Sequence, residues 1–202
     1  EKMEYNPALH FSPTQVLDPR SITGMKHNWD GLLELNTNVI GSIPMPSGDF
    51  NAILTTAPGV ATRSELGSEY SVRGGGYDEN LVYVNGIEVY RPFLIENGEQ
   101  EGLSFINPDM VSSAYFSAGG FEAKYGDKMS SVLDVTYRKP TAFAASVSGS
   151  FLGGTAHAEG ISKNHKLTYI AGVRYKTNQY VLSSLDIKGS YKPRFADGQF
   201  YL

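Results

Sequence analysis

The sequence has no cysteine and few charged residues. Its 202 residues contain no Cys, which excludes disulfides, thiolate zinc sites and cysteine nucleophiles among them. Charged residues make up 19% of the chain, the net charge is −4, and Lys and Arg form no cluster. Because nucleic-acid-binding proteins need a basic surface, that class is excluded and no nucleic-acid partner is expected.

Motifs for catalysis and for metal or cofactor binding are also missing. The four histidines lack the spacing of metal ligands: His10, His27, His157 and His165. No Gly-x-Ser-x-Gly nucleophile motif is present. Gly74–Gly76 suggests a phosphate loop, but no Lys-Ser or Lys-Thr follows, and two acids that would repel phosphate do. The sequence therefore predicts no enzyme, no metal site and no cofactor.

No apolar run approaches the roughly 18 residues of a membrane helix. The C-terminal part instead alternates in polarity with period two, as strands do. One strand is predicted by the apolar set Phe143, Ala145, Val147, Gly149 and Phe151. A second is predicted by Leu167, Tyr169, Ala171, Val173 and Tyr175, and a third begins near Gly198–Leu202. Each run has the length of a tilted membrane strand, but a soluble antiparallel sheet alternates in the same way.

The distribution of charge indicates a boundary near Pro140. Residues 1–140 hold 10 Lys and Arg against 18 Asp and Glu, a net charge of −8. Residues 141–202 hold 7 against 3, a net charge of +4. This asymmetry indicates two segments in different surroundings, although a chance scatter of charges in a short segment would give the same counts.

Short helices are predicted between the glycines and prolines of the first part. Ser47 is predicted to cap a helix over Asp49–Thr56, which Pro58-Gly59 ends. A weaker helical turn is predicted at Trp29–Leu33. Asn107-Pro108 predicts a cap and first helical position before a single turn.

Strands are predicted at Tyr70–Arg73, Leu81–Val84, Ile87–Val89, Ser113–Phe116 and Val132–Tyr137. Asn85-Gly86 lies between two of them and predicts a hairpin, because a type I′ turn needs positive φ at both central positions. Tyr90–Leu103 is predicted to be a long loop. The result is a small mixed α+β domain.

Three stretches, in this order, resemble the plug domain of TonB-dependent outer-membrane receptors. They are "ILTTAPGV" (Ile53–Val60), "YSVRGGGYDENLVYVNGIEV" (Tyr70–Val89) and "INPDMVSSAYFSAGGFEAKYGDKMSSVLDVTYRKP" (Ile106–Pro140). In that family a Pro-Gly-Val helix end precedes an Arg-Gly strand, a hairpin and a closing apolar strand. The stretch "DENLVYVNGIEVYRPFLIENGEQEGLSFINPD" is most similar to receptors of the Bacteroidetes type.

The resemblance implies an α+β plug domain followed by the first antiparallel strands of a transmembrane β-barrel, which has 22 strands in the family. Residues 1–46 would lead into the plug, residues 47–140 would form it, and residues 141–202 would supply the first two to three barrel strands of a longer chain. The implied function is energised uptake of a ligand by a TonB-dependent receptor. Its place is the outer membrane, with the plug facing the periplasm and the barrel lumen.

The resemblance also implies partners. They are periplasmic TonB, outer-membrane lipid, a small ligand such as a sugar, peptide or chelate, and a surface lipoprotein. TonB would add a strand to a short N-terminal box. The stretch "EKMEYNPALHFSPTQV" contains no clear match to that box.

By the same resemblance, two loops point outward and contact the ligand, Gly75–Asn80 and Tyr90–Glu101. Their candidate ligand-binding residues are Tyr77, Asp78, Glu79, Tyr90, Arg91, Phe93, Glu96, Asn97, Glu99 and Gln100. Aromatic rings beside hydrogen-bonding groups suit such a ligand, whereas the plain alternative is that the acids are solvated loop residues. Arg73 is predicted to lock the plug to the barrel wall, because a buried guanidinium needs carboxylate partners.

Two other functions stay open at this stage. One is a binding or structural role in a larger outer-membrane assembly, in which the barrel is a scaffold or a client. The other is a soluble adhesion module whose strands alternate without forming a barrel.

Overall fold

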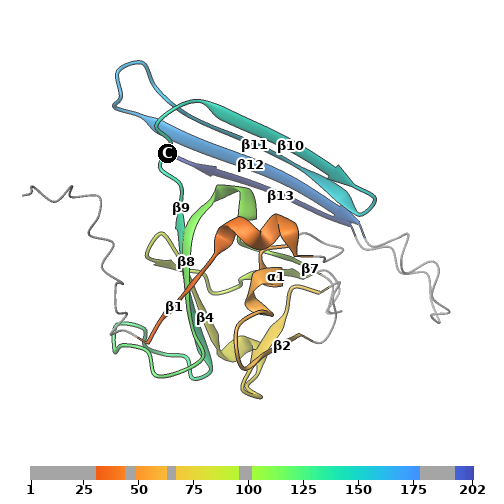
Figure 1. Ribbon diagram of the computed structural model, residues 1–202, viewed down its shortest axis with the longest axis vertical. Coiled ribbons are helices and arrows are strands. Elements are labelled where there is room, and N and C mark those ends of the chain that lie inside the picture. Colours follow the sequence, from red (N-terminus) through yellow and green to blue (C-terminus); the bar gives the residue numbers. More distant parts are fainter. Residues whose placement is uncertain (1–30, 44–48, 63–66, 96–101, 178–193) are drawn as a thin grey trace, which may run out of the picture.

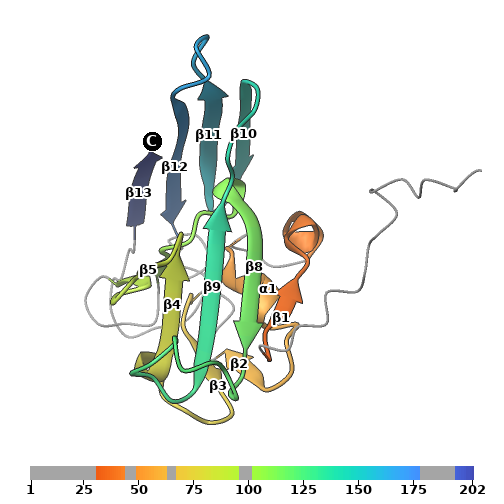
Figure 2. The same ribbon diagram turned by 90° about the vertical axis from the view of Figure 1, so that its left-hand side faces the viewer.

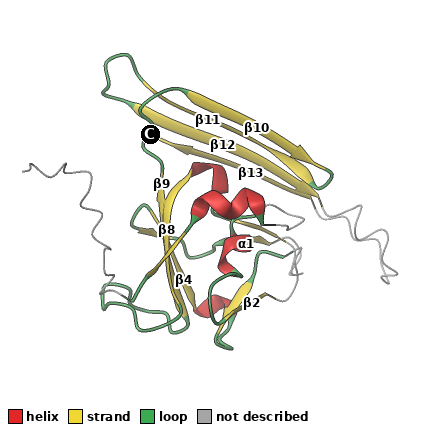
Figure 3. Ribbon diagram, in the orientation of Figure 1, coloured by secondary structure: helices red, strands yellow, loops and turns green. Residues whose placement is uncertain are grey.

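The computed structural model describes residues 31–43, 49–62, 67–95, 102–177 and 194–202. An N-terminal α+β domain is followed by a four-stranded antiparallel sheet that lies across one end of it (Figures 1 and 3). Within these ranges no helix is long and apolar enough to cross a membrane.

The N-terminal domain is built on a five-stranded mixed sheet in the order β1-β8-β9-β4-β5. Its strands are β1 (Leu33–Leu35), β4 (Asn80–Val84), β5 (Ile87–Glu88), β8 (Val111–Ser117) and β9 (Ser131–Tyr137). Strands β4 and β9 are parallel, and the other neighbours are antiparallel. Two small pairs flank this sheet: β2 (Val60–Thr62) with β3 (Tyr70–Val72), and β6 (Phe93–Ile95) with β7 (Gly102–Ser104).

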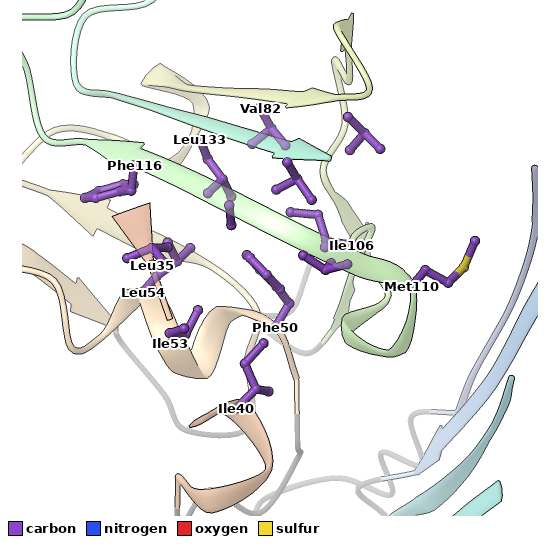
Figure 4. Packing of buried hydrophobic residues seen from close by; sticks show 14 of the residues in the cluster. Leu35, Ile40, Phe50, Ile53, Leu54, Val82, Ile106, Met110, Phe116 and Leu133 are labelled. Carbon is purple, nitrogen blue, oxygen red and sulfur yellow. The ribbon is translucent and has the colours of Figure 1, made fainter. Parts of the chain in front are cut away.

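One face of this sheet packs against α1 (Asn51–Leu54) and the 3-10 helix η2 (Thr37–Ser42). Figure 4 shows Phe50, Ile53 and Leu54 pointing toward Leu133 and Phe116 of the sheet. All of these side chains are buried, and each contributes about 1.5–3 kcal/mol through the apolar surface it removes from water. This core fixes the positions of the loops at both ends of the sheet.

The predicted strands of this domain are confirmed within one or two residues, and so is the hairpin. Asn85 and Gly86 have φ of 52° and 76°, as a type I′ turn requires. The Asn107 cap is also confirmed: its side chain accepts a hydrogen bond from the Asp109 N–H at the start of the 3-10 helix η4 (Pro108–Met110). A third 3-10 helix, η3 (Tyr77–Glu79), precedes β4.

Two local predictions are wrong in part. The helix over Asp49–Thr56 is only the four residues of α1, and Asp49 is buried, where it accepts hydrogen bonds from the N–H groups of Phe50 and Ser104. The predicted turn ending at Leu33 gives way to β1, because Gly31 takes φ of 66° and Leu33 then pairs with Phe116. Ser47 and Trp29 lie outside the described residues.

The predicted loop from Tyr90 to Leu103 contains the β6–β7 hairpin. Strands of three residues are too short for a period-two pattern to reveal them. Strand β1 likewise joins the sheet ahead of the predicted domain start at residue 47.

The C-terminal sheet has four strands in the order β10-β11-β12-β13, whereas the sequence indicated two or three. They are β10 (Ala144–Ser150), β11 (Gly153–Ile161), β12 (Thr168–Thr177) and β13 (Arg194–Tyr201). Sequence reasoning missed β11. Its outward residues are small alanines and glycines, and the middle of its inward face is polar, so it lacks the apolar face that revealed β10.

Candidate functional site

The β10–β13 sheet has two different faces. Apolar side chains on the face away from the N-terminal domain are exposed: Val147 is 84% exposed and Phe151 94%, and Phe143, Val173 and Phe200 share this face. The opposite parity faces the domain, and on β12 it carries the buried side chains of Ile170, Arg174 and Lys176. The period-two pattern predicted from the sequence for β10 and β12 is thus confirmed.

Arg174 is the centre of the contact between the two parts. Its side chain is buried, and it donates hydrogen bonds to three consecutive backbone carbonyls, those of Ser104 (2.8 Å), Phe105 (3.4 Å) and Ile106 (2.9 Å). On the other side its Nε donates to the carboxylate of Asp197 on β13, at 3.0 Å. A guanidinium fits this role because its N–H donors lie in a fixed planar fork.

Two further side chains of the sheet hold the same segment. Lys176 donates to the Gly102 carbonyl at 3.3 Å, and the Gln199 amide donates to the Phe105 carbonyl. We call Arg174, Lys176 and Gln199 the carbonyl clamp. Gln199 also accepts a hydrogen bond from the Tyr137 hydroxyl at 2.8 Å. Burial raises the pKa of Tyr137 to about 12, so this hydroxyl keeps its proton at neutral pH.

Around η4 the two parts are in contact through close packing and one side-chain hydrogen bond. The Asn107 side chain lies against the β12 backbone at Gly172, where an added Cβ would come within 2.3 Å of its Nδ2. Thr155 of β11 donates to the Asp109 carboxylate at 2.9 Å and is hydrogen-bonded to Ser148 of β10. A cavity of about 300 Å³ lies beside these groups. It is lined by residues of both parts, among them Asp49, Leu103, Ser148, Thr155, Arg174 and Lys176.

Three buried polar atoms near this interface have no hydrogen-bond partner among the described residues. They are Asn107 Nδ2, His157 Nε2 and Glu159 Oε2. His157 and Glu159 both face inward from β11, with 3.4 Å between Nε2 and Oε2. Within the described ranges no group of three or more His, Cys, Asp or Glu side chains is arranged to hold a metal ion.

Arg73, the predicted lock, lies at a different place. It follows β3 in a turn with φ of 51°, and its backbone N–H donates to the Gly59 carbonyl at 2.8 Å. Its exposed side chain lies over Gly59 and Gly119, where an added Cβ would come within 3.3 and 3.5 Å of it. The guanidinium forms no ion pair with the residues that the structure describes.

The first predicted ligand loop is packed onto the segment before β9. Glu79 accepts a hydrogen bond from the Ser130 hydroxyl at 2.6 Å, and the Asp78 carbonyl accepts one from Lys128 at 2.7 Å. Gly75 leaves room for this contact, because a Cβ there would lie 1.8 Å from the Ser130 Oγ. Tyr77 is 51% exposed.

The second predicted loop lies at the other end of β4. Tyr90 is 82% exposed, Arg91 is also exposed, and Phe93 begins β6. Glu96, Asn97, Glu99 and Gln100 lie outside the described residues. Figure 2 shows η3 and β5 at opposite ends of β4. Among the described residues, the structure therefore does not bring the two loops together.

Sequence reasoning missed the residues that join the two parts. The signal available was the inward parity of β12, where Arg174 and Lys176 fall, together with the positive charge of residues 141–202. The binding partner of these side chains could not be predicted from the sequence, because the clamp binds backbone carbonyls and every residue has one.

Comparison with known proteins agrees with this architecture. Residues 39–133, just under half of the chain, match the family model for the TonB-dependent receptor plug domain. No curated protein matches the sequence. The crystal structure of the siderophore receptor PirA from Acinetobacter baumannii has a similar fold, with a TM-score of 0.51 at 16% sequence identity. The match covers 74% of this chain and 25% of that receptor, so the chain spans a quarter of its length. Residues 39–133 are thus similar to the plug domain of TonB-dependent receptors, and the shared fold agrees with that match. We call the N-terminal α+β domain the plug.

Proposed function

We propose that this chain is the plug and the first wall strands of an outer-membrane receptor that takes up a ligand through a plugged β-barrel. The two-faced β10–β13 sheet carries the proposal. Its outward face carries large apolar side chains, as lipid requires, and its inward face carries the polar side chains that bind the N-terminal domain. A soluble module would have no reason to expose Val147, Phe151 and Phe200 on one face.

The finer parts of the proposal rest on the family. We propose a barrel of 22 strands, energised by TonB, with a plug that faces the periplasm and the lumen. We also propose that the receptor is of the Bacteroidetes type and works with a surface lipoprotein. The ligand is a sugar, a peptide or a chelate. The similarly folded PirA is a siderophore receptor, and a siderophore complex falls within the chelate class.

The plugged barrel is tested by removing the plug from the full-length protein. Cells that express the protein without residues 31–137 should become sensitive to vancomycin, which is too large for ordinary porins, while cells with the intact protein stay resistant. A matched control carries the same deletion in a variant that is retained in the cytoplasm. Resistance in spite of correct insertion of the deleted form would refute the plugged barrel.

Energised transport is separated from a structural role by TonB. Uptake of radiolabelled candidates, namely a ferric siderophore, an oligosaccharide and a peptide, is compared in cells with and without TonB. Binding that is equal in both strains, with no uptake in either, would favour a component of a larger assembly.

The loop residues predicted to contact ligand remain part of this proposal. Tyr90 and Tyr77 are both well exposed, so Tyr90→Ala and Tyr77→Ala should cost little stability and report on ligand directly. Because their loops lie at opposite ends of β4, each is tested singly. We expect Tyr90→Ala to lower uptake of the identified ligand about tenfold, as loss of an aromatic contact does, with receptor amounts unchanged. Unchanged uptake in both variants would remove these loops from the site.

The Arg73 lock is proposed to pair with a carboxylate of the wall.

A further inference from the structure

The carbonyl clamp binds one continuous segment of the plug, Gly102–Ile106. Its donors reach four carbonyls of that segment, those of Gly102, Ser104, Phe105 and Ile106. Tyr137 is joined to the same group through Gln199. Hence five hydrogen bonds from β12 and β13 converge on one short stretch of plug backbone.

The N–H groups of the same segment are bonded to the plug. Ser104 N donates to the Asp49 carboxylate at 3.0 Å, Phe105 N donates to the Pro92 carbonyl at 2.7 Å, and Ile106 N donates to the Ser104 hydroxyl at 3.3 Å. The segment is therefore held between two sets of partners, the plug on its N–H side and the wall on its carbonyl side. Movement of the plug against the wall has to break one of the two sets.

The cost of breaking is concentrated in Arg174. It is 5% exposed and supplies three of the bonds to carbonyls, and hydrogen bonds from a charged donor in a buried site are about twice as strong as neutral ones. Its charge is balanced by Asp197, which belongs to the wall and not to the plug. For Arg174, release of the plug therefore separates no ion pair: it keeps the Asp197 carboxylate and loses only the carbonyls.

Space for a release exists next to the clamp. The cavity of about 300 Å³ is lined by Arg174 and Lys176 on the wall side and by Leu103 on the plug side. Strand β10 contributes only small inward side chains, Ser148 and Ser150, to this lining. Segment Gly102–Ile106 also follows directly on the loop after β6, for which ligand contact is proposed.

We propose that Arg174 is the latch of the plug: it holds Gly102–Ile106 to the wall in the closed state, and the segment must leave Arg174 when the passage opens. The inference rests on the proposed function of a plugged barrel. In this proposal a residue of the wall, Arg174, retains the plug near the second loop, and its partners are backbone carbonyls. Arg174 acts as a positioning residue and need not contact the ligand.

The test uses the full-length protein in a background without other cysteines, with Ser104→Cys as the reporter. Ser104 is 2% exposed, so its thiol should react slowly with a membrane-impermeant methanethiosulfonate reagent. Arg174→Met should accelerate the labelling roughly 10- to 100-fold, because the Ser104 and Ile106 carbonyls lose their donor and the Phe105 carbonyl keeps only the Gln199 amide. Arg138→Met is the matched control, since the exposed Arg138 donates to a single carbonyl, that of Val111 at 3.1 Å, and should leave the rate unchanged.

Two further variants keep the test decisive. If Arg174→Met fails to insert, Arg174→Lys keeps the charge but not the planar fork, and should accelerate labelling in the same direction by less. Asp197→Asn should have a smaller effect than Arg174→Met, because the carbonyl bonds remain. Equal labelling in Arg174→Met and Arg138→Met, or a larger effect of Asp197→Asn, would overturn the latch. If plug deletion admits vancomycin but substitution of Arg174 does not change the labelling rate, only the latch proposal is refuted. If plug deletion does not admit vancomycin, the plugged-barrel proposal itself is refuted.

Discussion

Gly172 of β12 lies directly against Asn107 of η4, and this contact gives a sharp prediction. In Gly172→Ala the new Cβ would lie 2.3 Å from Asn107 Nδ2 and 3.1 Å from Met110 Sδ. Both neighbours are fully buried, so neither side chain can move aside into solvent. The Asn107 amide must therefore shift, and with it the cap that it provides to the Asp109 N–H.

The size of the effect follows from three contributions. Overpacking a well-packed site costs about 1–3 kcal/mol, and weakening an Asn cap costs about 1 kcal/mol. Replacing glycine by alanine in a strand returns roughly 0.5–1 kcal/mol of conformational entropy. We expect the contact between η4 and β12 to be weakened by about 1–3 kcal/mol. Gly198→Ala is the matched control: its Cβ would meet only Val173 at 3.8 Å, an ordinary contact.

Hydrogen–deuterium exchange of the full-length protein measures this difference. The Asp109 and Met110 amides, bonded to the Asn107 side chain and carbonyl, should exchange about 5- to 150-fold faster in Gly172→Ala than in the parent protein. Gly198→Ala should leave them unchanged. Equal protection in the two variants would refute the close approach of Asn107 to β12.

The remaining predictions concern the plug itself. Gly75→Ala places a Cβ 1.8 Å from the Ser130 Oγ and should lower the free energy of unfolding of the plug by about 1–3 kcal/mol, measured by urea denaturation. In the control Gly126→Ala the new Cβ meets no atom within 4 Å, so this variant should be neutral. A neutral Gly75→Ala would contradict the packing of this loop. Burial raises the pKa of Tyr137 from 10.0 to about 12, so its contribution to stability is complete below pH 10 and is lost as the pH rises from 10 to 12. Comparing the parent protein with Tyr137→Phe over this pH range isolates the contribution, and identical pH profiles would show that the tyrosine stays solvated.

Much of the plug could be predicted from its sequence because the signals are local. Asn85-Gly86 adopts positive φ at both positions and Asn107 caps η4, and each feature depends on a residue and its near neighbours. The period-two patterns of β10 and β12 were visible because one face of each strand is apolar and large. Strand β11 was not predicted because its outward face consists of alanine and glycine, which do not form a large apolar face.

The site was predicted less well because it depends on contacts between distant segments. By itself the sequence determined the plug resemblance, the two-faced strands, and the absence of a nucleophile motif, of metal-ligand spacing and of a basic surface. Only the tertiary structure decided that Gly75–Asn80 and the loop after Tyr90 lie at opposite ends of β4, since both begin from the same short strand. It also decided that Arg174, which the sequence did not single out, joins the β10–β13 sheet to the N-terminal domain. The physical reason is that the carbonyls bound by Arg174 are identical in every residue, so only the fold determines which of them a guanidinium can reach.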